Sequence, residues 1–135
     1  MKLEDLQEEL KNDLVIDPTK LEYESANNPV LYGKWLNKYS SIKKEMLALE
    51  NQKKKSLKER LDYYTGRGDD VCMDSYERSE LKTVLSADQD VLRADTKLQY
   101  YGILLDFCSN SMDVIKSRGF AIKNSIEMRK FEAGV

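Results

Sequence analysis

The chain has 135 residues, of which 41% are apolar and 34% are charged, with a net charge of −2 and no histidine. This length corresponds to one domain with a modest core, and the composition favours long helices over a sheet sandwich. Without histidine the chain offers no imidazole base, no Ser–His or Cys–His nucleophile pair and no ordinary zinc site, so we expect neither an enzyme nor a cofactor.

The N-terminal segment predicts an amphipathic helix. Its leucines recur at steps of three and four residues: Leu3, Leu6, Leu10 and Leu14. This spacing places them on one face, and Asp17-Pro18 is expected to end the helix. Thr19 is then expected to cap a second, short helix through Ala26. Acids stand where a secretory signal would need an apolar core, and no stretch approaches the ~20 apolar residues that span a bilayer, so we expect a cytosolic protein without membrane contact.

A much longer helix is predicted from Asn27-Asn28-Pro29, which has the favoured order of a cap followed by proline at the first helical position. Apolar side chains then recur at steps of three or four residues: Leu31, Trp35, Tyr39, Ile42, Met46, Leu49, and after a gap Leu57, Leu61 and Tyr64. A helix over 29–65 would be ~55 Å long at ~1.5 Å per residue, more than a compact monomer of this size covers. Lys53 fills the gap on the apolar stripe, so we infer that 50–67 projects into solvent with its basic side outward.

Turn signals separate this helix from the C-terminal half. Glycines and acids in 65–70 predict a solvent loop. Asp74 with Glu77 three residues later resembles a capping box, which predicts a third helix beginning near residue 74. A second capping signal, Ser86-Ala87-Asp88-Gln89, predicts a kink or a short break.

The C-terminal half carries the most regular apolar pattern of the chain. Its members alternate in steps of three and four residues: Leu98, Tyr101, Leu105, Cys108, Met112, Ile115, Gly119, Ile122 and Ile126. Such a heptad seam is typical both of an intramolecular core helix and of a contact between chains. A flanking apolar stripe (Leu104, Phe107 and Val114) favours more than one neighbour. We therefore predict that the side chains of the seam mediate oligomerisation.

These patterns together predict an all-α fold of long helices with short connections, assembled as a helical ring oligomer through its C-terminal helices. Within a single compact unit, 1–73 is expected to be a helical region with the basic helix and 74–135 the oligomerisation region. Arg118-Gly119 is expected to end one helix before a short one over 120–131. Cys72 and Cys108 are expected to be free thiols.

The charge of the chain is distributed unevenly. Residues 1–33 carry a net charge of −5, residues 34–67 a net charge of +6 and residues 68–135 a net charge of −3. A cationic block inside an acidic protein attracts polyanions, because lysines placed on phosphates release condensed counterions. A solvated helix face is the alternative interpretation of the same charges. The candidate phosphate contacts are Lys43, Lys44, Lys54, Lys55, Lys58, Arg60 and Arg67.

Aromatic residues beside these cations bear on which nucleic acid would bind. Tyr63 and Tyr64 lie one turn beyond Arg60, where their rings can stack on unpaired bases, which favours single strands. Both tyrosines can equally belong to the core. A few phosphate contacts per subunit would bind weakly and without sequence preference, and repetition around a ring would strengthen that binding.

Several segments resemble the UvsY family, the recombination mediators of T-even-type bacteriophages. They are Leu3–Leu10, Leu57–Tyr64 with the following Gly66-Arg67-Gly68, Leu81–Asp88, Ile103–Ser109 and Lys116–Lys123. The resemblance covers essentially the whole chain. It implies a homo-oligomer, a hexamer or heptamer ring, that binds single-stranded DNA and loads the phage recombinase UvsX onto strands covered by the phage single-strand binding protein. It also implies work in recombination-dependent replication and repair, in the cytoplasm of the infected bacterial host.

The family's basic motif Leu-Lys-x-Arg-Leu falls on Leu57–Leu61, so the resemblance assigns DNA binding to Lys58 and Arg60. Glu59 stands at the variable position and weakens the local positive field. The C-terminal part of the family is associated with self-assembly, in agreement with the predicted seam. The alternative function is a helical adaptor that binds an acidic protein partner through its basic helix.

Overall fold

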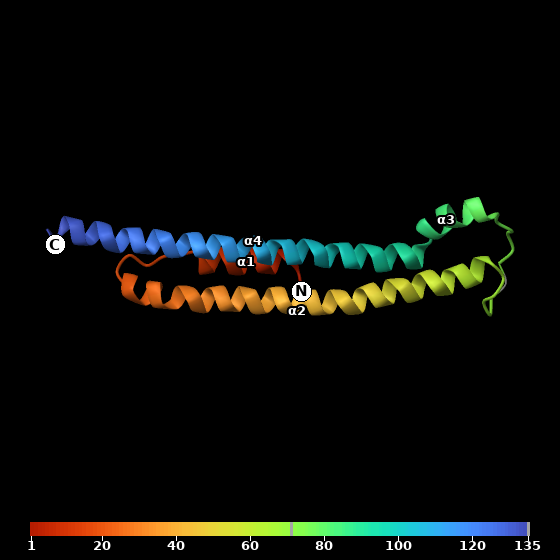
Figure 1. Cartoon of the computed structure of the whole chain (residues 1–135), viewed down its shortest axis with the longest axis horizontal. Helices are drawn as coiled ribbons and strands as arrows, with labels where there is room; N and C mark the ends of the chain where they lie inside the picture. Colours follow the sequence, from red (N-terminus) through yellow and green to blue (C-terminus); the bar gives the residue numbers. More distant parts are fainter. Residues whose placement is uncertain (71, 135) are drawn as a thin grey trace. The chain divides into compact units, whose positions relative to one another are not determined.

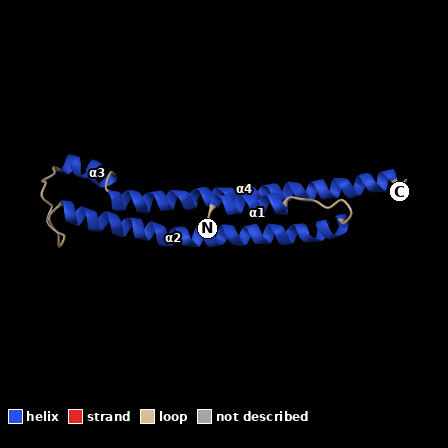
Figure 2. Cartoon of the chain, turned by 180° about the vertical axis from the view of Figure 1, so that it is seen from behind, coloured by secondary structure: helices blue, strands red, loops and turns tan. Residues whose placement is uncertain are grey.

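The computed structural model describes residues 1–70 and 72–134, and its regular elements in these ranges are all helices (Figures 1 and 2). In chain order they are α1 (Leu3–Asp13), α2 (Leu21–Tyr64), α3 (Arg78–Ser86) and α4 (Gln89–Glu132). The predicted all-α fold of long helices with short connections is therefore confirmed. None of these helices has an apolar stretch suited to crossing a membrane.

The contacts of the chain divide it into two units. Unit 1 contains Met1–Ile42 and the chain from Ile103 onward, and unit 2 contains Lys43–Gly102. Each long helix thus contributes one segment to each unit. Both units include residues from either side of position 73, the boundary that divides the regions expected from the sequence.

Unit 1 has an apolar core between α1, the first half of α2 and the second half of α4. Its buried apolar side chains are Leu6, Leu21, Trp35, Ile42, Leu104, Cys108, Ile115 and Ile122. The Trp35 ring packs edge-on against Phe107, and its Nε1 donates a hydrogen bond of 3.0 Å to Asp13 Oδ2 at the end of α1. The predicted first helix is confirmed, with Leu6 as its buried leucine.

The two helices predicted on either side of Asn27-Asn28-Pro29 are one continuous helix, so that prediction is wrong. Pro29 lies inside α2, where proline has no N–H to give to the helix. The Asn28 side chain does not cap a helix but reaches α4, where Nδ2 donates to the Ile115 carbonyl at 2.9 Å. Contacts with α4 thus take the place of the capping contacts that the local sequence suggested.

The predicted helix end at Arg118-Gly119 is also wrong, because α4 continues through it to Glu132. A Cβ atom on Gly119 would lie 2.8 Å from Asn28 Nδ2. Glycine at this position therefore allows the Asn28 amide to approach α4 closely. The glycine serves helix packing rather than helix termination.

Arg118 and Glu24 form a buried ion pair in unit 1. The Arg118 side chain is 3% exposed and pairs with Glu24 Oε2 at 2.5 Å. The same guanidinium donates to Asn28 Oδ1 and to the Val15 carbonyl, each at 2.8 Å. These contacts connect α2, α4 and the chain after α1 at one point.

In unit 2, the second half of α2 packs with α3 and the first turns of α4 around Leu49 and Val91. The predicted break near residues 86–89 is confirmed, since α3 ends at Ser86 and α4 begins at Gln89. Asp88 Oδ1 accepts hydrogen bonds from the backbone N–H groups of Asp90 and Val91, at 2.9 and 3.3 Å. Asp88 therefore caps α4, as its sequence position indicated.

The predicted capping box at Asp74 is wrong, because α3 begins only at Arg78 and its flanking Glu77 makes no side-chain capping bond. The carbonyl of Asp74 instead accepts a weak hydrogen bond from the Cys72 thiol at 3.3 Å. Cys72 and Cys108 are both free, as expected. Burial raises the pKa of the Cys108 thiol, so this thiol is a packing group.

Candidate nucleic-acid interface

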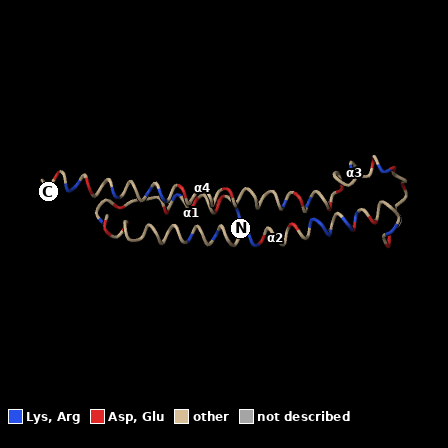
Figure 3. Tube along the Cα trace, viewed as in Figure 1, with Lys and Arg blue, Asp and Glu red and all other residues tan. Residues whose placement is uncertain are grey.

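The outer face of α2 in unit 2 carries five exposed lysines, which we call the lysine face: Lys43, Lys44, Lys54, Lys55 and Lys58. At 3.6 residues per turn they fall within an arc of about 120°. The opposite side of the helix carries the buried Leu49 and the half-buried Met46. Blue segments along this part of α2 mark the same run of cations in Figure 3. The outward direction predicted for the basic side of this helix is thus observed.

Lys58, a member of the lysine face, forms an ion pair within α2. Its Nζ lies 2.7 Å and 2.8 Å from the two oxygens of Asp62, one turn later on the same helix. The lysine side chain is 67% exposed. Because exposed pairs of this kind contribute little stability, a phosphate can replace Asp62 at small cost.

Arg60 lies on the inner side of α2. Its Nε donates a hydrogen bond of 2.8 Å to Asp88 Oδ2, and the Tyr64 hydroxyl donates to the same oxygen at 2.7 Å. The guanidinium also lies over the Tyr63 ring, 4.4 Å from its centroid. Both tyrosines are half-buried and take part in this cluster. Arg60 therefore connects α2 to the start of α4.

The ionisation of this cluster follows from these hydrogen bonds. The hydrogen bond that Arg60 donates to Asp88, together with its interaction with Tyr64, raises the pKa of the Arg60 guanidinium. Burial alone would raise the pKa of the Asp88 carboxyl, but hydrogen bonds from Tyr64 and Arg60 outweigh it, and the pKa is lowered. The bond to Asp88 raises the pKa of the Tyr64 hydroxyl. Asp88 is thus a buried carboxylate with a cation and a phenol as partners.

Lys53 does not indicate a projecting helix end, and this inference from the sequence is wrong. Its Nζ forms an ion pair of 2.8 Å with Asp95 Oδ1 of α4. The same two residues line a cavity of about 340 Å³ together with Leu57 and Val91. The stretch 50–67 therefore packs within unit 2, and its core-facing lysine is satisfied by a carboxylate from α4.

The loop after α2 carries several acidic residues, which oppose the binding of a phosphate. Gly66 adopts a left-handed φ of +78°, and the backbone N–H of Arg67 donates to the Asp62 carbonyl at 2.7 Å. The adjacent cavity of about 430 Å³ has carboxylates among its lining residues, including Asp69 and Asp90. Arg67 is exposed, but these acids weaken the positive field around it.

Two further cations of the basic block belong to unit 1, where acids of α1 neutralise them. Lys34 pairs with Asp13 at 2.5 Å and with Glu9 at 3.2 Å, and Lys38 pairs with the same Glu9 oxygen. Burial alone would lower the pKa of Lys34, but the bonds to Asp13 and Glu9 outweigh it and raise the pKa. The acidic start of the chain thus offsets the first lysines of the basic block.

Comparison with known proteins identifies the family. A family model described as "Recombination, repair and ssDNA binding protein UvsY" matches residues 9–135. The chain belongs to the UvsY family. It is 71% identical to the recombination protein uvsY of Enterobacteria phage T4 over 136 residues, which cover 99% of each chain.

Solved structures of the UvsY family have the same fold. A crystal structure of the bacteriophage T4 recombination mediator UvsY in lattice type II aligns with a TM-score of 0.90 at 70% identity, covering 98% of both chains. The lattice type IV structure aligns with a TM-score of 0.91 at 68% identity, covering 97% of this chain and 99% of the other. The family resemblance noted from the sequence is therefore confirmed.

The seam predicted for oligomerisation in this UvsY-family chain divides into two groups. Cys108, Ile115 and Ile122 are buried inside unit 1. The other predicted members are half-buried: Leu98, Tyr101, Leu105, Met112, Gly119 and Ile126. The inner group belongs to the chain's own core, so contacts between UvsY-type subunits through the seam remain a prediction for the outer group.

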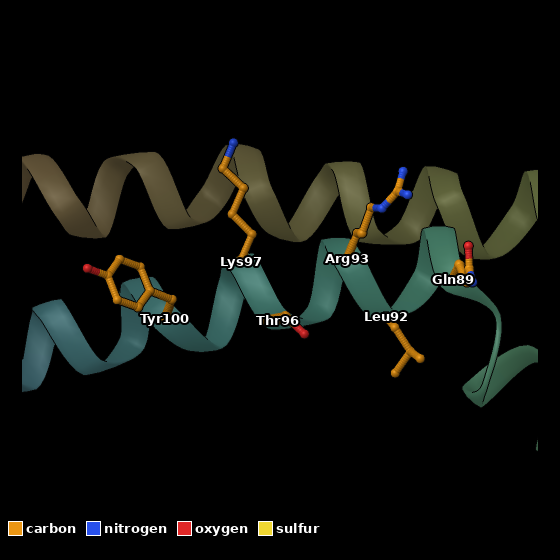
Figure 4. Close-up of a pocket in the computed structure, with 6 residues that line it drawn as sticks. All are labelled: Gln89, Leu92, Arg93, Thr96, Lys97 and Tyr100. Carbon is orange, nitrogen blue, oxygen red and sulfur yellow. The ribbon is translucent and has the colours of Figure 1, made fainter. Parts of the chain in front are cut away.

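Sequence reasoning missed two cations on α4. Arg93 and Lys97 are exposed, lie one helical turn apart and line a shallow groove of about 650 Å³ in unit 2. Figure 4 shows both side chains extending in the same direction from α4, with Leu92 directed away from them. Their spacing of four residues was the available signal. It was overlooked because the basic block was defined on α2 alone.

Proposed function

We propose that this chain is a recombination mediator that binds single-stranded DNA during homologous recombination and repair. Membership of the UvsY family supports the role, since the family description names recombination, repair and single-strand binding. The lysine face of α2 is the observation that supports the binding mode, because five exposed ammonium groups lie within one arc of a helix. Backbone phosphates of a single strand are its natural ligand.

Binding by one subunit is proposed to be weak and insensitive to sequence. Lysines contact phosphates as flexible point charges and do not read bases. We propose that a hexameric or heptameric ring repeats the lysine face, so that one strand engages several subunits and gains avidity. The half-buried seam residues of α4 are proposed to contact neighbouring subunits.

The two basic residues of the family motif receive different roles in this proposal. Lys58 is proposed to release Asp62 and bind phosphate, because its pair is exposed. Arg60 is proposed to keep its hydrogen bond from Nε to Asp88, while its remaining N–H groups contact a phosphate from the inner side of α2, outside the lysine face. Arg60 therefore acts as a DNA contact and as a positioning residue for α2.

The double variant Lys58→Ala/Arg60→Ala tests the assignment. We expect affinity for a labelled dT oligonucleotide to fall about tenfold and its salt dependence to flatten by about 1.4 in log–log slope, since each lost phosphate contact on a single strand contributes about 0.7. Fluorescence anisotropy between 50 and 300 mM salt measures both. The control is Lys2→Ala/Lys11→Ala, two exposed lysines of unit 1. Unchanged affinity in the motif variant would reject the assignment.

Loading of the phage recombinase UvsX onto strands covered by the phage single-strand binding protein is the proposed cellular role, in the cytoplasm of the infected host. A strand bent along the lysine face would hold its covering protein less tightly and become available to the recombinase. Native mass spectrometry with and without a single-stranded oligonucleotide tests the ring, and a lone chain under both conditions would contradict it.

A helical adaptor for an acidic protein is the competing function. It predicts no measurable affinity for single strands at physiological salt, whereas the mediator predicts affinity that declines steadily as salt rises. The same titration therefore separates the two functions.

A further inference from the structure

A second groove lies in unit 1, whereas the lysine face belongs to unit 2. The groove has a volume of about 620 Å³ and runs between α2 and α4. Residues of α2 (Ser25, Asn28, Pro29 and Tyr32) and of α4 (Lys116, Gly119, Phe120 and Lys123) line it. Several of these side chains are small, which leaves a hollow between two otherwise closely packed helices. Its volume falls in the range of small-molecule sites.

The charge of this groove has one sign. Lys116 and Lys123 are both exposed, and no carboxylate is among the described residues that line it. The acid of α2 nearest in sequence, Glu24, is buried and paired with Arg118. The residues that line the groove thus carry two positive charges and no negative charge, on a chain whose net charge is −2.

Aromatic rings accompany the two cations. Phe120 is 67% exposed, although water is a poor environment for an aromatic hydrocarbon ring. The Lys116 ammonium lies 5.6 Å from the centroid of the Tyr32 ring. An open aromatic face beside two ammonium groups matches one repeat of a single strand, which pairs a flat base with a phosphate.

We propose that this groove binds a nucleotide of single-stranded DNA, with its base stacked on Phe120 and its flanking phosphates on Lys116 and Lys123. The inference rests on the proposed single-strand binding and adds to it a contact that recognises bases. The lysine face of unit 2 reads phosphates alone, whereas this groove distinguishes an unpaired base from a bare sugar–phosphate chain. An unpaired base is what separates a single strand from a duplex, whose bases are stacked and covered.

Other occupants agree less well with the groove. An acidic peptide would use the two lysines but gives no reason for an exposed phenylalanine between them. A second copy of the chain would bury Phe120, yet both lysines would then need carboxylate partners at the contact. A nucleotide would place its base on the Phe120 ring and its phosphates on the two lysines at the same time.

The test compares two labelled oligonucleotides of equal length, one of dT and one with abasic sites throughout. The full chain is expected to bind dT more tightly, because only dT can stack. Phe120→Ala should lower dT affinity about fivefold or more and leave abasic affinity unchanged, while Phe120→Trp restores the preference. Lys116→Ala/Lys123→Ala should weaken both oligonucleotides equally. Phe131→Ala is the matched control, since Phe131 is 79% exposed on the same helix.

The remaining outcomes overturn the inference in separate ways. If the unmodified chain binds dT but Phe120→Ala retains the full preference for dT, the groove is not a base site and the proposed function stands. If Phe120→Ala changes the native mass, a second copy occupies the groove. If Phe120→Ala abolishes binding of an oligoglutamate peptide and leaves dT binding intact, the groove binds an acidic protein segment. If the unmodified chain binds no single strand at all, both proposals fail.

Discussion

Unit 1 has the larger apolar core and a buried ion pair, whereas the cations in the ion pairs that join the helices of unit 2 are partly exposed. Unit 1 buries Trp35, Ile42, Leu104, Cys108, Ile115 and Ile122 to 2% exposure or less. Among the described residues of unit 2, the buried apolar side chains are Leu49 and Val91, at 4% and 5%. Its helices are joined instead by the Arg60–Asp88 and Lys53–Asp95 pairs. The unit that carries the lysine face is therefore the one with the smaller apolar core.

The arginines of the two units illustrate the consequence. Arg118 in unit 1 is 3% exposed, whereas Arg60 in unit 2 is 29% exposed. A fully buried cation must keep its partners, because an unpaired charge away from water is very costly. A half-exposed cation can exchange part of its contacts for a phosphate. The difference in burial between the two side chains thus distinguishes a structural arginine from one whose N–H groups can still reach a ligand.

Replacing the buried arginine should produce the largest effect. Arg118→Met leaves Glu24 buried without its cation, and we expect the free energy of unfolding to fall by about 3–5 kcal/mol. Urea unfolding at fixed protein concentration measures it. Lys130→Met, an exposed cation of the same helix, is the control and should have little effect. Glu24→Leu combined with Arg118→Met should recover part of the loss; equal stability of all variants would remove the contrast between the units.

A smaller, pH-dependent effect is expected at Asp88. Asp88→Asn removes the charge that Arg60 and Tyr64 contact, which should cost about 1–3 kcal/mol at neutral pH. Because the folded-state pKa lies below the ordinary 3.8, the carboxylate stabilises the fold above that value, and this contribution is lost as pH falls through the folded pKa. Unfolding curves at pH 7 and pH 3 should therefore differ more for the unmodified chain than for the variant. Asp90→Asn, 57% exposed, is the control; a constant difference across pH would contradict the assignment.

The smallest effect on stability is expected at the lysine face. Lys54→Ala/Lys55→Ala removes two exposed ammonium groups that form no ion pair within the described residues, so the melting temperature should stay unchanged. The log–log salt slope of single-strand binding should fall by about 1.4, at about 0.7 per phosphate. Thermal unfolding measures the melting temperature, and fluorescence anisotropy measures the salt slope. A lowered melting temperature would show that the face is structural.

The local sequence pattern predicted where helices form better than it predicted which residues of different helices contact each other. The leucine spacing located α1, and the capping signal at Asp88 located the start of α4. Asn28 and Gly119 were interpreted as a helix start and a helix end, because both residues are common there. Their actual role is to contact each other across two helices, which no local window can contain.

Arg60 illustrates which part of the candidate site was predictable from the sequence. Met46, Lys53 and Arg60 are spaced by seven residues, so they share one face of a helix. That spacing places Arg60 on the inner face together with Lys53, but the sequence analysis interpreted Lys53 alone as a sign of a solvated helix end and Arg60 as a phosphate contact. The interpretation failed because Asp88 and Asp95, which compensate the two charges, lie about thirty residues or more farther along the chain.

By itself the sequence determined the helical class, the extent of the basic block and the family resemblance, because periodicity, charge and motif are properties of neighbouring residues. Only the tertiary structure decided which charges are paired and which remain available. A lysine or arginine is neutralised by whichever carboxylate lies within a few ångströms of it. For these three cations the carboxylate comes from a distant part of the chain: Glu24 for Arg118, Asp88 for Arg60 and Asp95 for Lys53.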